Sequence, residues 1–179
     1  KKVMEFCTNS IVTINGKWYN QKKHVYTFLN PCFDQSEYLI AKEIAGSKDY
    51  NSNLNLCFVG RMEAAKGPEL FIDALETLQS NKEIGHIFFV GEGPEKEKYI
   101  EKSKALDCDI TFTGSITRHD LNKIYKICHL IILPTSASEG FPKVISEAMS
   151  FGCVPIVTNI SSLSQYVNYK NGVLINDID

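Results

Sequence analysis

LNLCFVGRMEAAKG, residues 54–67, sets the fold of this chain. The apolar run 54–59 has the length and composition of a buried strand, and Gly60 ends it. The segment 68–79 then begins with proline and repeats its apolar residues at the spacing of a helix face. A buried strand followed directly by an amphipathic helix predicts one β-α unit.

The same unit recurs along the rest of the chain. Strands are expected at 87–90, 110–113, 130–133, 154–158 and 173–175, and helices at 36–45, 94–106, 118–128, 142–151 and 162–167. Short strands of mostly apolar residues that alternate with helices are typical of a parallel sheet covered on both faces. The sequence therefore predicts an α/β fold with a doubly wound parallel sheet, which is Rossmann-like. In this fold ligands bind at the carboxyl ends of the strands.

The first 34 residues differ from this pattern. The segments 11–14 and 24–29 are strand-like, with a turn signal at Asn15-Gly16 between them, and Asn30-Pro31 interrupts the chain. We interpret residues 1–34 as a linker or the trailing edge of an absent N-terminal domain. Residues 35–179 are then the Rossmann-like domain.

The composition indicates an ordinary soluble domain. The chain has 179 residues, 44% of them hydrophobic and 22% charged, with a formal net charge of −2. It therefore lacks the positive field that holds nucleic acid, and no apolar run approaches the ~20 residues of a membrane span. The cysteines show no metal-binding spacing, so we expect small buried hydrophobes in a reducing compartment and a cytoplasmic protein. They are Cys7, Cys32, Cys57, Cys108, Cys128 and Cys153.

The loop after the first of these buried strands is a candidate anion site. Arg61 and Lys66 follow Gly60, and Gly67 leads into a helix. Cations beside a helix N-terminus attract phosphate, and the missing side chain of Gly60 allows close approach to the backbone. On spacing alone, two ordinary solvated surface cations are the somewhat better interpretation.

Two further strand-end loops carry weaker signals. Val90-Gly91-Glu92-Gly93-Pro94 lacks the third glycine of a dinucleotide fingerprint, and a tight strand-to-helix turn explains it equally well. In the other loop, Glu139 precedes a helix that contains Glu147. A nucleotide sugar could place hydroxyls on both carboxylates and its diphosphate at the helix end. Ordinary surface charges remain the alternative for both glutamates.

Taken together, these motifs resemble a known family. They are Gly60-Arg61, Lys66-Gly67, Gly91-Glu92-Gly93-Pro94, Phe112-Thr113-Gly114, Leu133-Pro134-Thr135-Ser136, Glu139-Gly140-Phe141-Pro142, Glu147-Ala148-Met149, Gly152 and Pro155-Ile156-Val157. In this order they are similar to the group 1 retaining glycosyltransferases of the GT-B architecture. The two glutamates separated by seven residues are that family's signature. The resemblance implies that this chain is the C-terminal, donor-binding half of a two-domain enzyme.

The resemblance also implies roles for particular residues. Arg61 and Lys66 should bind the diphosphate, Glu147 the ribose and Glu139 the transferred sugar. The remaining substrate-binding positions are expected at Gly60, Ser115, Ile116, Gly140, Phe141, Pro142, Lys143 and Val144. Ser115 and Ile116 should meet the base. Many family members have glycine where this chain has Pro142, which lacks an N–H group.

The expected donor is a nucleoside-diphosphate sugar, with no metal or other cofactor. The other expected partners are the absent N-terminal domain and an acceptor glycan or lipid-linked sugar, with the parent enzyme at the inner face of the membrane. We expect this segment alone to be inactive. The alternatives are a nucleotide-sugar epimerase or phosphorylase on the same fold, or a non-catalytic nucleotide-sugar-binding module.

Overall fold

The computed structural model describes residues 10–28, 33–78, 81–137 and 140–176. Its centre is a six-stranded parallel sheet with the order β5-β4-β3-β6-β7-β8. The strands are β3 (Leu54–Val59), β4 (Ile84–Val90), β5 (Ile110–Gly114), β6 (Leu130–Leu133), β7 (Val154–Thr158) and β8 (Val173–Ile175). The chain winds outward from β3 to β5 and then returns to β6 on the other side of β3. This reversal makes the β3–β6 boundary a topological switch point, where a doubly wound sheet offers a ligand crevice.

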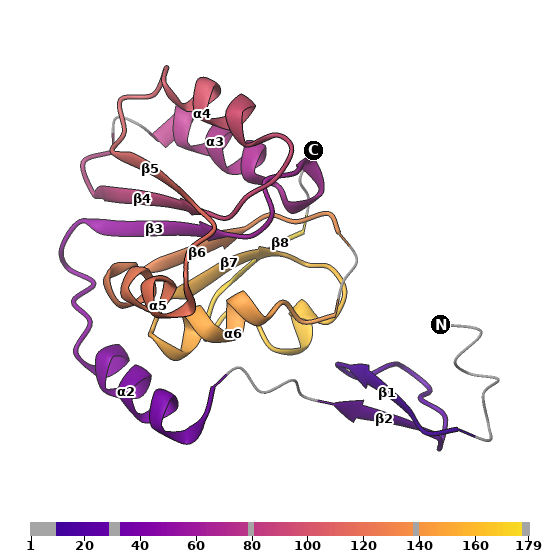
Figure 1. Cartoon of the computed structure of the whole chain (residues 1–179). Helices are drawn as coiled ribbons and strands as arrows, with labels where there is room; N and C mark the ends of the chain where they lie inside the picture. The colour runs from indigo at the N-terminus through magenta and orange to yellow at the C-terminus, as the bar shows by residue number, and fades with distance from the viewer. Residues whose placement is uncertain (1–9, 29–32, 79–80, 138–139, 177–179) are drawn as a thin grey trace.

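The helices lie on both faces of the sheet, as the alternating pattern predicts (Figure 1). Helices α3 (Pro68–Leu78) and α4 (Lys96–Ser103) pack together on one face. Helices α5 (Arg118–Ile127) and α6 (Lys143–Ser150) lie on the other, where α2 (Gln35–Gly46) contacts them both. Right-handed crossovers place successive helices on opposite faces when the direction of winding reverses.

Aromatic side chains fill the core beneath α3. The rings of Phe58 and Phe71 lie 5.8 Å and 5.1 Å from the ring of Phe89, and Phe112 stacks on Phe89 at 4.7 Å. Phe58, Phe71 and Phe89 are buried, and such a cluster stabilises the sheet through both area and ring geometry. It fixes β3 and β4, and therefore the loops at their carboxyl ends.

Several element boundaries differ from the sequence prediction. The segment 94–106 is helical only at residues 96–103, and 162–167 holds only a single 3-10 turn, Leu163–Gln165. The helix predicted from residue 142 begins one residue later, because Pro142 has the extended ψ of 126° and serves as the N-cap. Extended backbone at this position directs the chain out of the preceding loop before the helix starts.

The strand-like N-terminal segments form a small sheet of their own. β1 (Val12–Asn15) and β2 (Val25–Phe28) pair in parallel and lie to one side of the main sheet (Figure 1). Lys17 donates its N–H to Gln165 Oε1 at 2.7 Å, and Asn15 donates to the Phe141 carbonyl at 3.4 Å. The boundary near residue 34 and the assignment of 1–34 to another domain stay predictions.

The cysteine prediction is confirmed for Cys57, Cys128 and Cys153, which are buried free thiols. Cys108 is free and half-buried, whereas Cys7 and Cys32 lie outside the described residues. Within the described part of the chain, no three His, Cys, Asp or Glu side chains are grouped so that they could hold a metal ion. In the same residues, every helix is too short or too polar to cross a membrane.

Candidate functional site

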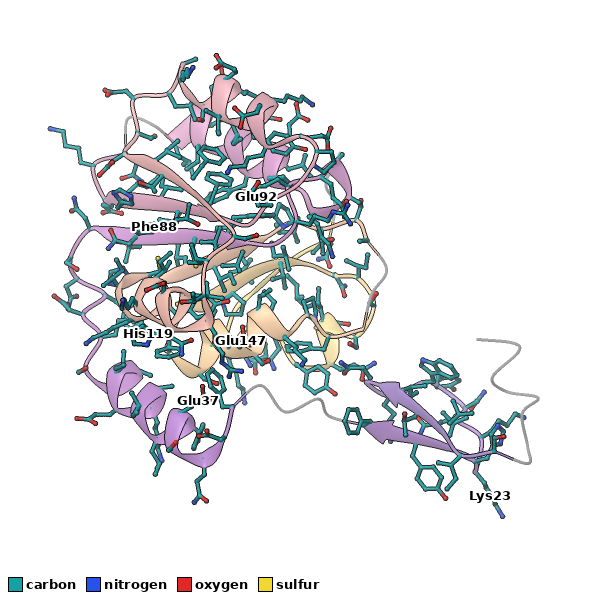
Figure 2. The ribbon with its side chains drawn as sticks, viewed as in Figure 1. Lys23, Glu37, Phe88, Glu92, His119 and Glu147 are labelled. Atoms are coloured by element: carbon teal, nitrogen blue, oxygen red, sulfur yellow. The ribbon has the colours of Figure 1, made fainter. Side chains whose placement is uncertain are left out.

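The candidate site lies where the carboxyl ends of four adjacent strands meet. Because β5, β4, β3 and β6 are neighbours in a parallel sheet, the loops that follow them lie along one edge. The Gly60 N–H donates to the Val90 carbonyl, and the Gly91 N–H donates to the Gly114 carbonyl, each at 3.0 Å. Figure 2 marks this edge by Glu92, just beyond the end of β4. The edge contains the three motif-bearing loops of the sequence.

The glycines of the second motif allow two of these loops to pack against each other. Gly91 has a φ of +133°, and a Cβ there would lie 2.0 Å from the Gly60 carbonyl oxygen. A Cβ on Gly93 would lie 2.4 Å from the Met62 carbonyl oxygen. Close packing of the two loop backbones therefore accounts for both glycines of the motif, an explanation that the sequence analysis did not offer.

The loop after β3 carries the two predicted cations. Arg61 is exposed, and its Nε lies 3.2 Å from a carboxylate oxygen of Glu63. Lys66 is half-buried at the end of a 3-10 turn, Ala64–Lys66, which the sequence analysis did not predict. Gly67 ends the turn with a φ of +79°, and a Cβ there would lie 2.2 Å from the Pro134 carbonyl oxygen. The cation loop therefore lies directly against the loop that follows β6.

The loop after β6 leads into α6. The Phe141 ring packs edge-on against Tyr166 at 4.7 Å, and the Val144 carbonyl accepts a hydrogen bond from the buried Tyr125 hydroxyl at 3.3 Å. A Cβ on Gly140 would lie 2.9 Å from the Cβ of Asn15, so this loop also contacts the small N-terminal sheet. Lys143, the first residue of α6, is exposed. Contacts on several sides thus fix the start of α6.

Glu147 lies in the second turn of α6 and is half-buried (Figure 2). Burial raises the pKa of its carboxyl above the usual value, and the nearby charge of Glu37 adds to the rise. The charges of Arg118 and Lys143 act in the opposite direction and favour the carboxylate. A partly desolvated carboxylate next to a helix end is a strong acceptor for hydroxyl groups.

The loop after β5 has one solvent-facing and one core-facing position. Ser115 is exposed, whereas Ile116 packs against the core. Gly114 turns the chain with a φ of +70°, and Thr117 begins α5 by accepting a hydrogen bond from the Asp120 N–H. Because β5 is the outermost strand next to β4, the loop that follows it lies at the outer end of the same edge.

The structure thus brings most of the predicted residues to one edge of the sheet. They are Gly60, Arg61, Lys66, Ser115, Ile116, Gly140, Phe141, Pro142, Lys143, Val144 and Glu147. Glu139 lies outside the described residues. The charged groups that act on Glu147 are Arg118 on α5, Lys143 on α6 itself and Glu37 on α2.

Two residues that support the edge were not identified from the sequence. Glu95 accepts a hydrogen bond from the Ala64 N–H, and Thr135 donates one to the Ala65 carbonyl. Their partners lie 31 and 70 positions away in the chain, so no local pattern links them. Glu95 had been placed in the predicted helix 94–106 and Thr135 in the family motif Leu133-Pro134-Thr135-Ser136, but neither had been given a role.

Comparison with known proteins identifies the family. The model of the family described as glycosyl transferases group 1 matches residues 41–178, and the chain belongs to this family. An undecaprenol-PP-saccharide α-1,4-N-acetyl-D-galactosaminyltransferase of Campylobacter jejuni is 27% identical over 166 residues. The aligned region covers 91% of this chain but 41% of that enzyme. The chain therefore spans less than half the length of this relative.

Solved structures confirm the predicted Rossmann-like fold. The C-terminal domain of a group 1 glycosyltransferase, LpcC of Francisella tularensis, matches with a TM-score of 0.60 at 24% identity. That match covers 75% of this chain and 73% of the solved LpcC domain. Anabaena HepE, solved with UDP and glucose, matches with a TM-score of 0.65 at 21% identity over 85% of this chain and 43% of HepE. The fold is that of the C-terminal half of a GT-B enzyme, as the sequence predicts.

Proposed function

We propose that this chain is the donor-binding domain of a retaining glycosyltransferase that uses a nucleoside-diphosphate sugar. The observation that carries the proposal is the shared edge at the β3–β6 switch point. Arg61 and Lys66 project from the loop after β3, which packs directly against the loop leading to the N-terminus of α6. Two cations on a loop that packs against the segment leading to a helix N-terminus suit a diphosphate.

The proposed chemistry is stabilisation of the leaving group. When the bond between the anomeric carbon and the diphosphate oxygen breaks, the electron pair stays on the diphosphate. Arg61, Lys66 and the first N–H groups of α6 stabilise this added negative charge, and the anomeric carbon gains oxocarbenium character. Donors that are already in place lose little free energy to reorganisation, which makes such stabilisation effective. We propose that these two cations do for the diphosphate what a metal does elsewhere, with no metal required.

The remaining residues hold the two ends of the donor. Glu147 accepts hydrogen bonds from the ribose hydroxyls, and Ser115 and the Ile116 backbone border the base. The backbone of residues 141–144 borders the diphosphate and sugar. Glu139 contacts the transferred sugar, positioning it without forming a covalent bond.

The complete enzyme requires more than this chain. A facing N-terminal domain supplies the acceptor site, and residues 1–34 are the linker to it or its trailing edge. The acceptor is a lipid-linked or surface glycan, in line with the undecaprenol-PP-saccharide in the name of the Campylobacter jejuni relative. We place the parent enzyme in the cytoplasm, at the inner face of the membrane.

Calorimetric titration of this chain with UDP, GDP and ADP tests donor binding. We expect one of these nucleotides to bind with a dissociation constant in the micromolar to millimolar range. Arg61→Ala should weaken that binding roughly 10- to 100-fold, since a charge-assisted hydrogen bond contributes about 1.5–3 kcal/mol. Lys104→Ala is the matched control, because Lys104 is exposed beyond the end of α4 and pairs with Glu101.

Two outcomes would contradict the proposal. Folded protein that binds no nucleoside diphosphate would exclude a donor site, and equal affinity in Arg61→Ala would remove Arg61 from it. Product analysis with the complete enzyme separates the alternatives: an epimerase changes the sugar while it stays on the nucleotide, and a phosphorylase requires free phosphate. Binding without turnover of any donor would indicate a non-catalytic module.

A further inference from the structure

The carbonyl oxygen of Ala65, next to Lys66, is held from one side by the loop after β6. It accepts hydrogen bonds from Thr135 Oγ1 at 2.8 Å and from the N–H groups of Ser136 and Ala137 at 2.9 and 3.1 Å. Thr135 is only 1% exposed, and its Oγ1 also accepts from the Ala137 N–H at 3.1 Å. A buried hydroxyl that is bonded on both sides has little freedom to move.

Glu95 holds the same loop from the opposite side. Its Oε2 accepts hydrogen bonds from the Ala64 N–H at 2.5 Å and from the Tyr99 hydroxyl at 2.9 Å. The Glu95 N–H donates to the Met62 carbonyl at 3.2 Å, which adds a backbone bond between the two loops. Burial and the Glu95 carboxylate raise the pKa of Tyr99, so its hydroxyl stays protonated and continues to donate. Tyr99 itself is fully buried in the core, and it anchors the carboxylate.

The loop is also held at other points: Met62 is fully buried and its N–H donates to the Glu92 carbonyl at 2.9 Å, and Gly67 packs against Pro134. Apart from its 3-10 turn, it has no regular structure, and Arg61 is largely solvent-exposed. A flexible loop would have to become ordered when a diphosphate binds, which reduces affinity. A loop that is already fixed avoids that cost and presents both cations in place.

We propose that Glu95 and Thr135 are positioning residues that hold the Arg61–Gly67 loop in the shape that binds a diphosphate. The inference rests on the proposed donor-binding function and assigns the two residues a part in it. Neither residue touches the nucleotide. Each acts on the cations through the backbone of Ala64 or Ala65.

Paired substitutions separate hydrogen bonding from charge and from bulk. Glu95→Gln keeps an acceptor oxygen and removes the charge, whereas Glu95→Ala removes both. Thr135→Ser keeps the hydroxyl, whereas Thr135→Val keeps the shape and removes it. The probes are the nucleoside diphosphate that binds the unmodified chain best and its monophosphate, titrated by calorimetry.

We expect Glu95→Ala and Thr135→Val to weaken diphosphate binding about tenfold and monophosphate binding much less. Glu95→Gln and Thr135→Ser should remain within about threefold of the unmodified chain for both nucleotides. A merely structural role would lower the melting temperature without changing the ratio of the two affinities. If Glu95→Ala does not fold, Tyr99→Phe tests the same contact more mildly.

An unchanged diphosphate-to-monophosphate ratio in both Glu95→Ala and Thr135→Val would overturn the inference. Diphosphate binding more than about threefold tighter in Glu95→Gln would also overturn it. Repulsion between the Glu95 carboxylate and the diphosphate would then outweigh any positioning of the loop. Both results leave the proposed function standing, since the unmodified chain still binds. Failure of the unmodified chain to bind any nucleotide is the separate result that would overturn both proposals.

Discussion

The carboxylate of Glu63 lies 3.2 Å from the guanidinium of Arg61, on the loop that we propose binds the diphosphate. Glu63 is the N-cap of the 3-10 turn, but its side chain makes no capping hydrogen bond. The ion pair can therefore be removed without loss of a cap. The Glu63 carboxylate therefore competes with a diphosphate for the guanidinium of Arg61.

Glu63→Gln should therefore increase affinity for a nucleoside diphosphate. An exposed ion pair contributes about 0.2–1 kcal/mol, so we expect a gain of roughly 1.5- to 5-fold, which shrinks at high salt. Calorimetry at two ionic strengths measures both effects. Weaker binding in Glu63→Gln would show instead that the pair orients Arg61 for the ligand.

Glu147→Gln should have opposite effects on stability and binding. Because the folded-state pKa of Glu147 is raised, the folded chain binds the proton more tightly than the unfolded chain does. Glu147 therefore lowers stability as pH rises from the ordinary carboxyl pKa through the raised one, and the loss is complete above it. At pH 7, Glu147→Gln should melt at a higher temperature than the unmodified chain, and the difference should vanish below pH 4.

The same substitution should weaken nucleotide binding roughly tenfold or more, because the ribose hydroxyls lose a charged acceptor. Thermal unfolding from pH 3 to 8 and calorimetry measure the two effects. Glu97→Gln, at an exposed position of α4, is the matched control and should change neither. An unchanged melting temperature at pH 7 would show that burial of the Glu147 carboxylate does not lower the stability of the fold.

Lys48→Met tests a contact at the opposite, amino-terminal edge of the sheet. The Lys48 ammonium donates to the carbonyls of Tyr125 and Cys128 at the C-terminal end of α5 and lies 3.6 Å from Cys153 Sγ. Loss of these charge-assisted bonds should cost about 1.5–3 kcal/mol, or roughly 3–12 °C in melting temperature. Nucleotide affinity should not change.

Calorimetry and thermal unfolding of Lys48→Met separate the two effects. The matched control is Lys42→Met, since Lys42 is an exposed residue of α2. Equal melting temperatures for the two variants would mean that the Lys48 contacts contribute nothing to stability.

Gly91→Ala should destabilise the chain severely. The new Cβ would meet the Gly60 carbonyl oxygen at 2.0 Å, and the φ of +133° is one that alanine rarely adopts. We expect a loss of at least about 3 kcal/mol in the free energy of unfolding. Gly46→Ala is the control, because a Cβ there meets nothing within 4 Å and alanine favours the helix. Denaturant unfolding of both variants decides the matter, and similar midpoints would refute the packing role of Gly91.

The strand and helix pattern was predictable because it depends on local periodicity. Leu130–Leu133 is an uninterrupted apolar run and Leu54–Val59 is apolar except for Asn55, and each is a strand with the predicted bounds. The start of α6 was less predictable, because Pro142 fits both the N-cap and the first helical turn. Local sequence restricts its φ but leaves ψ to the surrounding contacts.

The candidate site was partly predictable for the same reason. Glycines and cations that follow strands point to the carboxyl edge of a parallel sheet, and Arg61 and Lys66 lie there. The supports of that loop were not predictable, because Glu95 and Thr135 reach it from distant parts of the chain. Hydrogen bonds between residues so far apart produce no periodic pattern in the sequence.

The sequence by itself determined the order of strands and helices and the family to which the chain belongs, because apolar spacing and short motifs are properties of neighbouring residues. Only the tertiary structure decided which loops touch. The return from β5 to β6 places the Ala65 carbonyl against Thr135, and packing of the glycine loops places Glu95 against Ala64. These contacts depend on the assembly of the sheet, which makes neighbours of residues far apart in sequence.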